Sequence, residues 1–373
     1  MKGIKRRILG VAVRMSLIMG MTACFYGAAH GYELTPQFSM GGVLAGAYQF
    51  ELGGEGHSGG ALPFQPEFSF RPWNNHEIFL KFGFAAGNGL SGKSPFVLAP
   101  WAADLEDDVK HIHGRNRDYL LTAWYRFTLE PLAGHTIGIT GGIIDATDYL
   151  DENAFANDEY TQFMNEALVN GPNGFAPSYD VGGALEWEYG PWSAKGVGMN
   201  VGENEAGNNY NFFGLQAGYK LNTSLGEGNY RLIYEGSPNE AFLAPDGITL
   251  ESRHALLISF DQAFGDVIGG WIRFGTQIQI AMVDYAHIYS GGLNISGNLW
   301  GRGQDNLGIG YGYLSGGNTG IVKTQVAEAY ARFGFMEYFA VTLDLQYMED
   351  RFDPGAGENV DGWIAGIRFA MEY

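Results

Sequence analysis

The chain has 373 residues, of which 57 are glycine, 14% are aromatic and only 17% are charged. Soluble domains typically have about half this share of glycine and about 25% charged residues, so this composition is unusual for a soluble enzyme. The formal net charge of −19 disfavours a nucleic-acid-binding function, because the phosphate backbone is bound by lysine and arginine.

The first 31 residues have the features of a secretion signal. A positively charged start precedes a short apolar run at Met15–Tyr26, and Ala28–Gly31 supplies the small residues of a cleavage site. The residues before Cys24 also weakly resemble a lipoprotein signal, which would place a lipid on this cysteine. Otherwise the only cysteine leaves with residues 1–31, and the mature chain has neither a disulfide nor a thiol ligand for a metal.

From residue 38 onward, apolar and polar residues alternate in one short segment after another. This alternation is typical of strands with one apolar and one polar face. The segments are 38–52, 62–71, 78–84, 119–128, 135–144, 179–189, 192–201, 210–221, 230–235, 254–262, 268–277, 285–295, 306–314, 325–333, 339–347 and 362–373.

The connections between these segments alternate in length. Short ones lie near residues 73, 131, 190, 225, 265, 300 and 336, and longer ones near 56, 100, 160, 205, 245, 281, 319 and 355. No run of 18 apolar residues follows residue 31, so a membrane helix is not expected, but a closed barrel can still span a membrane. The sequence therefore predicts an all-β fold: a transmembrane antiparallel β-barrel of about 16 strands, of outer-membrane porin type, in one domain at 32–373.

A soluble β-sandwich or solenoid would also show alternating strands. It does not account for the large aromatic residues at the strand ends, which form girdles in membrane barrels. A soluble β-rich binding protein is therefore the less favoured alternative.

The connection at 145–175 is about 30 residues long, and a loop of this length is functional or disordered. Its aromatic residues and methionine argue against disorder, because they need a surface on which to pack. They are Tyr149, Phe155, Tyr160, Phe163 and Met164.

The amino-acid sequence of this loop resembles that of the carbohydrate-selective porin (OprB) family. The resemblance rests on Asp145–Tyr149, Asp151, Asn153, Ala156–Asp158 and Gln162–Asn165. Later segments continue it in order, at Gly270–Gly275, Gly308–Tyr313, Glu328–Phe333 and Val341–Tyr347. It implies that the loop at 145–175 folds into the channel mouth. The terminal Phe369 and Tyr373 are similar to the aromatic end signal of outer-membrane proteins.

If the apolar faces contact lipid, the polar faces line the lumen and set its selectivity. Arginine, acids and amides could bind sugar hydroxyls there, and tryptophan could stack on a sugar ring. The bland alternative is that the inward charges pair with one another and fill the lumen. The predicted pore-lining and constriction residues are Arg71, Lys81, Trp124, Arg126, Asp148, Asp151, Glu152, Asp158, Trp271, Arg273, Glu328, Arg332, Asp344, Gln346 and Arg368.

Other patterns are weaker. His111 and His113 beside an acidic run, or the loop acids Asp148, Asp151 and Asp158, could bind a metal or Ca²⁺, but neither spacing matches a known site. No catalytic triad and no phosphate-binding loop is recognisable. The sequence predicts neither a cofactor nor a metal.

The predicted function is passive diffusion of sugars and similar small polar solutes across the bacterial outer membrane, with the degree of selectivity left open. The alternatives are a general or anion-type diffusion porin and a barrel-borne outer-membrane enzyme. The predicted partners are these solutes, outer-membrane lipid and lipopolysaccharide, and the barrel assembly machinery, with no nucleic acid. The oligomeric state, monomer or trimer, stays open.

Overall fold

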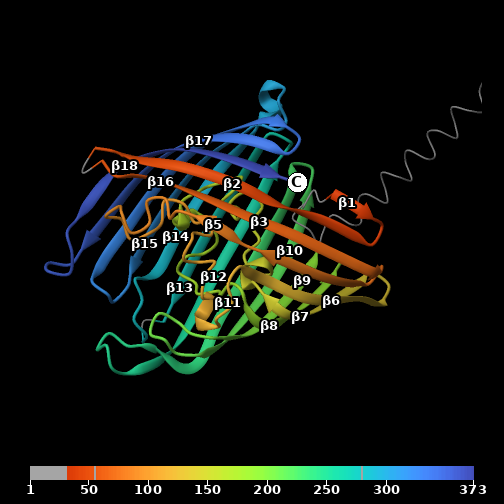
Figure 1. Ribbon diagram of the computed structural model, residues 1–373, viewed down its shortest axis with the longest axis horizontal. Coiled ribbons are helices and arrows are strands. Elements are labelled where there is room, and N and C mark those ends of the chain that lie inside the picture. The colour runs from red at the N-terminus through yellow and green to blue at the C-terminus, as the bar shows by residue number, and fades with distance from the viewer. Residues whose placement is uncertain (1–31, 54–55, 279) are drawn as a thin grey trace, which may run out of the picture.

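The computed structural model describes residues 32–53, 56–278 and 280–373. The predicted secretion signal at 1–31 lies outside the described residues. Figure 1 shows tilted strands arranged as a barrel along most of the chain.

A single 18-stranded sheet forms the wall, and all the strand pairs are antiparallel. Its strands are β1 (Tyr32–Thr35), β2 (Phe38–Leu52), β3 (Ser58–Trp73), β4 (His76–Phe82), β5 (Phe84–Ala86), β6 (Leu120–Leu132), β7 (His135–Ile144), β8 (Asp180–Tyr189), β9 (Trp192–Val201), β10 (Tyr210–Thr223), β11 (Gly226–Leu243), β12 (Leu250–Phe264), β13 (Ile268–Gln277), β14 (Tyr285–Ser296), β15 (Asn306–Gly316), β16 (Ile321–Met336), β17 (Phe339–Phe352) and β18 (Val360–Glu372).

The sheet closes on itself because β18 pairs with β2. The segments β4 and β5 are two parts of one interrupted strand, because both pair with β3, and the short β1 pairs with the start of β2. Counted in this way, the wall is a closed barrel of 16 antiparallel strands, which confirms the predicted fold class.

The connections alternate in length around the barrel, as the sequence predicts. At one end, here the short-turn rim, tight turns join β3 to β4, β6 to β7, β8 to β9 and β16 to β17. Gly190 in the β8–β9 turn has a φ of 57°, a left-handed conformation that glycine adopts without steric cost. The other end, the long-loop rim, carries the connections 87–119 and 145–179.

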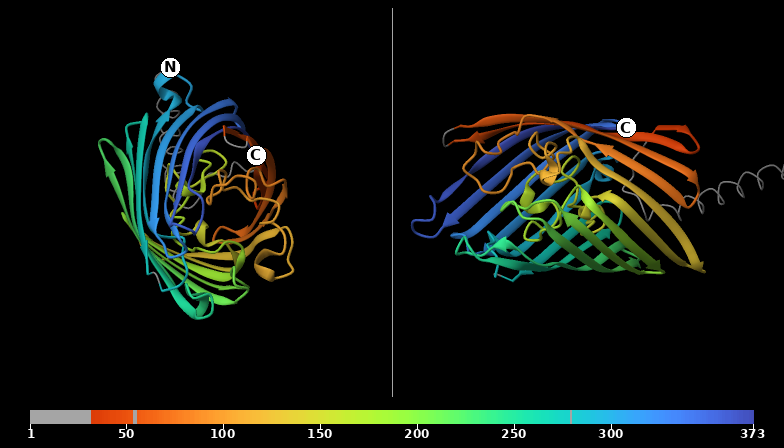
Figure 2. Two further views of the ribbon diagram at one scale, coloured as in Figure 1. Left: turned by 90° about the vertical axis from the view of Figure 1, so that its left-hand side faces the viewer. Right: turned by 60° about the horizontal axis from the view of Figure 1, so that its bottom comes forward.

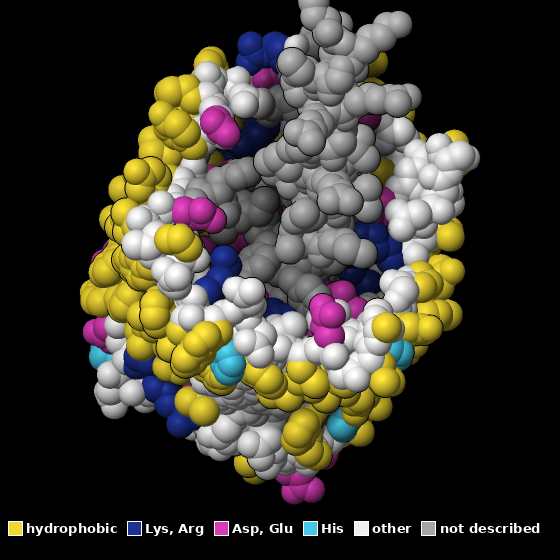
Figure 3. All heavy atoms as spheres, turned by 90° about the vertical axis from the view of Figure 1, so that its right-hand side faces the viewer, with side chains coloured by type: hydrophobic (Ala, Val, Ile, Leu, Met, Phe, Trp, Pro, Cys, Tyr) yellow, Lys and Arg dark blue, Asp and Glu magenta, His cyan; other side chains and the backbone are white. Residues whose placement is uncertain are grey.

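The outer faces of the strands are apolar, and most of the buried polar side chains of the wall lie on the inner faces. On β17, the side chains of Leu343 and Leu345 are exposed, whereas those of Asp344 and Gln346 are buried. Seen from the end in Figure 3, hydrophobic side chains surround the outside of the barrel and charged side chains lie towards the opening. This is the arrangement expected of a barrel that meets lipid outside and water inside. In the described part of the chain, no helix has the length and apolar character needed to cross a membrane.

The interior of the barrel is occupied by the two long connections, which Figure 2 shows inside the ring of strands. The buried apolar clusters lie between these connections and the wall. One of them joins Phe163 and Leu168 of the 145–179 connection to Trp271 on β13 and Tyr330 on β16. The core of this protein is therefore the packing of the loops against the inside of the barrel.

Candidate functional site: a lumen narrowed by two loops

The segment 145–179, here the constriction loop, is built from short capped turns. The carboxylate of Asp145 accepts a hydrogen bond from the Thr147 amide at 2.9 Å, at the start of the 3-10 turn Ala146–Asp148. Asn165 likewise accepts from the Ala167 amide at 3.0 Å and begins the turn Glu166–Leu168. Short Asp and Asn side chains form such local bonds readily, so they hold a compact loop without regular structure.

Arg273 on β13 fastens the middle of the constriction loop to the wall. Its Nε lies 2.7 Å from a carboxylate oxygen of Asp151, and its Nη1 donates to the Leu168 carbonyl at 3.0 Å. Its Nη2 donates to the carbonyl of Ala156. The side chain is 1% exposed, so its guanidinium group interacts with protein groups and hardly with solvent. The five donors of a guanidinium group suit it to such multiple binding.

Arg368 on β18 holds the next part of the loop. Its Nη1 donates to the Glu159 carbonyl at 2.6 Å and its Nη2 to the Gln162 carbonyl at 3.0 Å. The side chain has no exposed surface. Together with Arg273, it satisfies loop carbonyl groups that would otherwise be buried without a partner.

Glu328 on β16 binds the loop through main-chain donors. One carboxylate oxygen accepts from the Met164 amide at 2.7 Å and the other from the Asn165 amide at 2.9 Å. Beside these bonds, the ring of Phe163 packs edge-on against Trp271 and Tyr330, with centroid distances of 5.5 and 5.1 Å. Polar and apolar contacts thus fix the same stretch of loop.

The second connection, 87–119, packs against the constriction loop and against the wall strands β2 and β17. Its Ala102 amide donates to the Met164 carbonyl at 2.8 Å, and its Ala99 carbonyl accepts from the Glu166 amide at 3.0 Å. The Pro100 carbonyl accepts from two wall side chains, Gln346 at 2.9 Å and Gln49 at 3.1 Å. The two loops and the wall therefore form one hydrogen-bonded unit.

A polar cavity of about 1040 Å³ lies beside these loops. Its lining runs from Asp104 of the 87–119 connection, past Asp148 and Glu159 of the constriction loop, to Gly190 and Glu227 near the short-turn rim. The remaining lumen is thus bounded on one side by the loops and on the other by the inner faces of the wall strands.

Three loop acids, Asp104, Asp148 and Glu159, have raised pKa values because the barrel surrounds them. Burial raises the pKa of Asp104 to about 6, although Lys81 and a hydrogen bond from Tyr179 oppose the shift. Asp148 is open to the cavity but lies deep inside the barrel, which raises its pKa to about 7, and Asp145 adds to the shift. The pKa of Glu159 is raised to about 8 by burial and by Asp158. These carboxylates therefore change charge within the neutral pH range.

The predicted site residues fall into three groups. Those that line the cavity are Lys81, Asp148, Asp151, Glu152 and Asp158. Those buried behind the loops are Trp271, Arg273, Glu328, Asp344, Gln346 and Arg368.

The third group lies along the wall beyond the loops. Trp124 stacks on Phe79 at a centroid distance of 4.9 Å, and Arg126 pairs with Glu186 at 2.8 Å. Near the short-turn rim, Arg71 pairs with Glu77 at 3.0 Å and Arg332 donates to the Gln304 carbonyl at 3.1 Å.

The predicted site residues include none from the 87–119 connection, although the sequence marks it as a second long loop. Pro100, Trp101 and Asp104 belong to the loop unit, and Trp101 Nε1 donates to the Glu159 carbonyl at 3.0 Å. A signal existed, because about 30 residues with Trp101 and Leu105 are as unusual a loop as 145–175.

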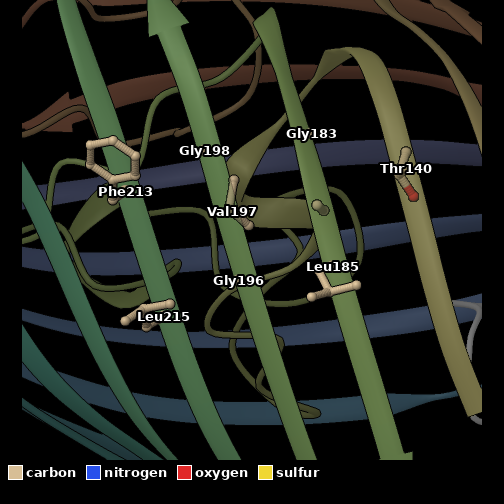
Figure 4. Close-up of a pocket in the computed structure, with 9 residues that line it drawn as sticks. Thr140, Gly183, Leu185, Gly196, Val197, Gly198, Phe213 and Leu215 are labelled. Atoms are coloured by element: carbon tan, nitrogen blue, oxygen red, sulfur yellow. The ribbon is translucent and has the colours of Figure 1, made fainter.

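A different depression, of about 530 Å³, lies on the outside of the wall. Figure 4 shows Leu185, Phe213 and Leu215 around a stretch of β9 in which Gly196 and Gly198 leave space. The exposed leucines and phenylalanine face the lipid side, so this depression is not part of the lumen.

No group of three or more potential metal ligands occurs among the residues that the structure describes. The two histidines considered as metal ligands, His111 and His113, have different surroundings. The His111 side chain is largely exposed, and Nε2 of His113 lies 2.7 Å from the carbonyl oxygen of Ser178.

Comparison with known proteins bears on the fold. No family model matches the chain. An uncharacterized protein of Aquifex aeolicus (strain VF5) is 27% identical over 302 residues, which cover 80% of this chain and 84% of that protein.

Solved porin structures superpose over most of the barrel. The high-pH structure of Pseudomonas putida OprB gives a TM-score of 0.70 at 14% identity, covering 90% of this chain and 94% of that one. A triple mutant of Rhodopseudomonas blastica porin gives 0.54 at 11% identity, covering 90% of this chain and 100% of that one.

The fold is therefore of the porin class, a closed 16-stranded antiparallel barrel with loops inside. Within this class the likeness to OprB extends along 90% of the chain, and at 14% identity it is a likeness of fold.

Proposed function

We propose that this chain is a passive diffusion channel of the bacterial outer membrane for sugars and similar small polar solutes. The observation that carries the proposal is the polar cavity of about 1040 Å³ left between the loop unit and the wall. A barrel of this strand number leaves an aqueous lumen, and the loops reduce it to the scale of small solutes. The short-turn rim then faces the periplasm, as in other barrels of this type.

The cavity has the groups that a sugar needs. Carboxylates such as Asp148 and Glu152 accept hydrogen bonds from hydroxyls, and Lys81 donates them. Phe175 and Tyr179 of the constriction loop contribute aromatic rings to the cavity lining, which suits the apolar face of a sugar. The sequence resemblance to carbohydrate-selective porins points in the same direction. Export by the segment 1–31 and insertion by the barrel assembly machinery belong to the same proposal.

The first test is solute passage through the purified, folded protein. In liposomes containing the protein, we expect swelling in isotonic monosaccharide to be fast and to slow steeply from disaccharide to trisaccharide, because the loops narrow the lumen. Sugar alcohols of matched size separate sieving from recognition of the sugar ring. Liposomes with heat-unfolded protein are the control. Equal swelling with all sizes would contradict a narrowed lumen, and no swelling with any solute would contradict a channel.

A further inference from the structure

The cavity is strongly unbalanced in charge. Among the described residues that line it, eleven carry a carboxylate side chain and four carry a lysine or arginine. Carboxylate rings on a pore wall favour cations, and lysine or arginine rings favour anions. The excess of carboxylates over lysine and arginine therefore gives the cavity a negative charge that favours cations.

Each of the four cavity-lining cations has an acidic partner close by. The pairs are Lys81–Glu67 at 3.4 Å, Lys220–Glu227 at 2.7 Å, Arg231–Asp261 at 2.6 Å, and Lys195 with both Glu152 and Glu186. Their positive charges are largely compensated locally, so they oppose an approaching cation only weakly.

The buried wall arginines do not restore the balance. Arg273 and Arg368 direct their guanidinium groups at loop carbonyls, behind the surface of the cavity. Asp148 and Glu159 are among the cavity-lining carboxylates that have no lysine, arginine or histidine nitrogen of the described residues within 4.0 Å. These two carboxylates face the cavity without a close counter-ion.

We infer that the lumen selects cations over anions and that Asp148 and Glu159 are residues that determine this selectivity. The inference rests on the proposed channel function and narrows it: the favoured charged solutes are small inorganic and organic cations, beside neutral sugars. It disfavours the anion-type porin.

The preference depends on pH with a definite sign. The raised pKa values of Asp148, about 7, and Glu159, about 8, leave both largely neutral at pH 5.5 and charged at pH 9. Cation preference therefore increases as the pH rises through this window. The charged groups facing Asp148 are Lys81, Glu67, Asp145 and Glu152, and those facing Glu159 are Asp158, Asp104 and Lys81.

The test is the reversal potential of the wild-type channel in a planar bilayer under a KCl gradient. We expect the sign that corresponds to K⁺ over Cl⁻ at pH 9, and a several-fold lower permeability ratio at pH 5.5. The double variant Asp148→Asn, Glu159→Gln should show a several-fold lower ratio at pH 9 and a weaker pH dependence, to which Asp104 and Glu235 of the cavity lining still contribute. The matched control is Asp353→Asn, Glu358→Gln, on an exposed connection outside the cavity, which should behave as wild type.

The outcomes separate the two proposals. A Cl⁻ preference, or a double variant with the wild-type reversal potential and pH dependence, overturns the inference while leaving the channel function in place. Folded protein that conducts no ion at all contradicts the channel function itself. Circular dichroism and gel mobility before and after boiling establish that each variant is folded.

Discussion

Deletion of Glu152–Asn165 is expected to leave a folded barrel whose single-channel conductance is several-fold higher than that of the wild type. The deleted stretch contains the carbonyls bound by Arg368 and the amides bound by Glu328. The wall does not depend on it, because the strands are joined by their own continuous ladder from β2 round to β18. An open lumen of this barrel size is a wide aqueous pore. Discrimination among sugars of different size should weaken in parallel.

A point variant tests the same attachment more gently. Arg273→Met leaves the Asp151 carboxylate without its partner and two loop carbonyls without their donor. Breaking one side of a buried ion pair typically costs about 3–5 kcal/mol, so the loop should loosen and the open-channel current should become noisier. Arg351→Met is the matched control, since Arg351 pairs with Glu349 and Asp361 in a more exposed position.

The deletion of Glu152–Asn165 also has an outcome that would contradict the expectation. If the deletion variant assembled and kept the wild-type conductance, the narrowest point would lie in the 87–119 connection.

Substitution of Leu345 by arginine is expected to cause the largest loss of assembly. Leu345 lies near the middle of β17 (Phe339–Phe352), and its side chain is 41% exposed on the outer face. An arginine on the lipid face costs roughly 2–4 kcal/mol at the midplane of the bilayer and roughly 0–1 kcal/mol near its interfaces. The folded fraction in lipid vesicles, measured by gel mobility without boiling in a urea series, should fall accordingly.

Two controls separate lipid exposure from a general effect of substitution. Leu132→Arg places the same side chain at the end of β6, beside the short-turn rim, and should fold almost as well as wild type. Asp344→Asn changes the inward neighbour of Leu345 without adding charge, and it should also assemble. If Leu345→Arg and Leu132→Arg assembled equally, the outer face of β17 would not be in contact with lipid.

The barrel could be predicted because the alternation of apolar and polar residues within each strand indicates which of its faces points outward. Successive residues of a strand point to opposite faces, so the run Leu343, Asp344, Leu345 indicates the outer, inner and outer face of the wall without reference to the rest of the chain. Turn signals such as Gly190-Pro191 mark the rims in the same local way. Strand number, antiparallel order and the alternation of short and long connections follow from these repeated local signals.

The site depended on tertiary structure because it is made of contacts between distant positions. Arg273 and Arg368 share the inward parity of pore-lining residues, yet the structure covers both with the constriction loop. Arg273 meets Asp151 across 122 positions and Arg368 meets Glu159 across 209. Parity determines only that a side chain faces the lumen, not whether it meets water or a folded loop there. Which inward charges are covered is decided by the path of the two long loops. These loops are irregular, so their sequences have no periodic pattern from which the path could be predicted.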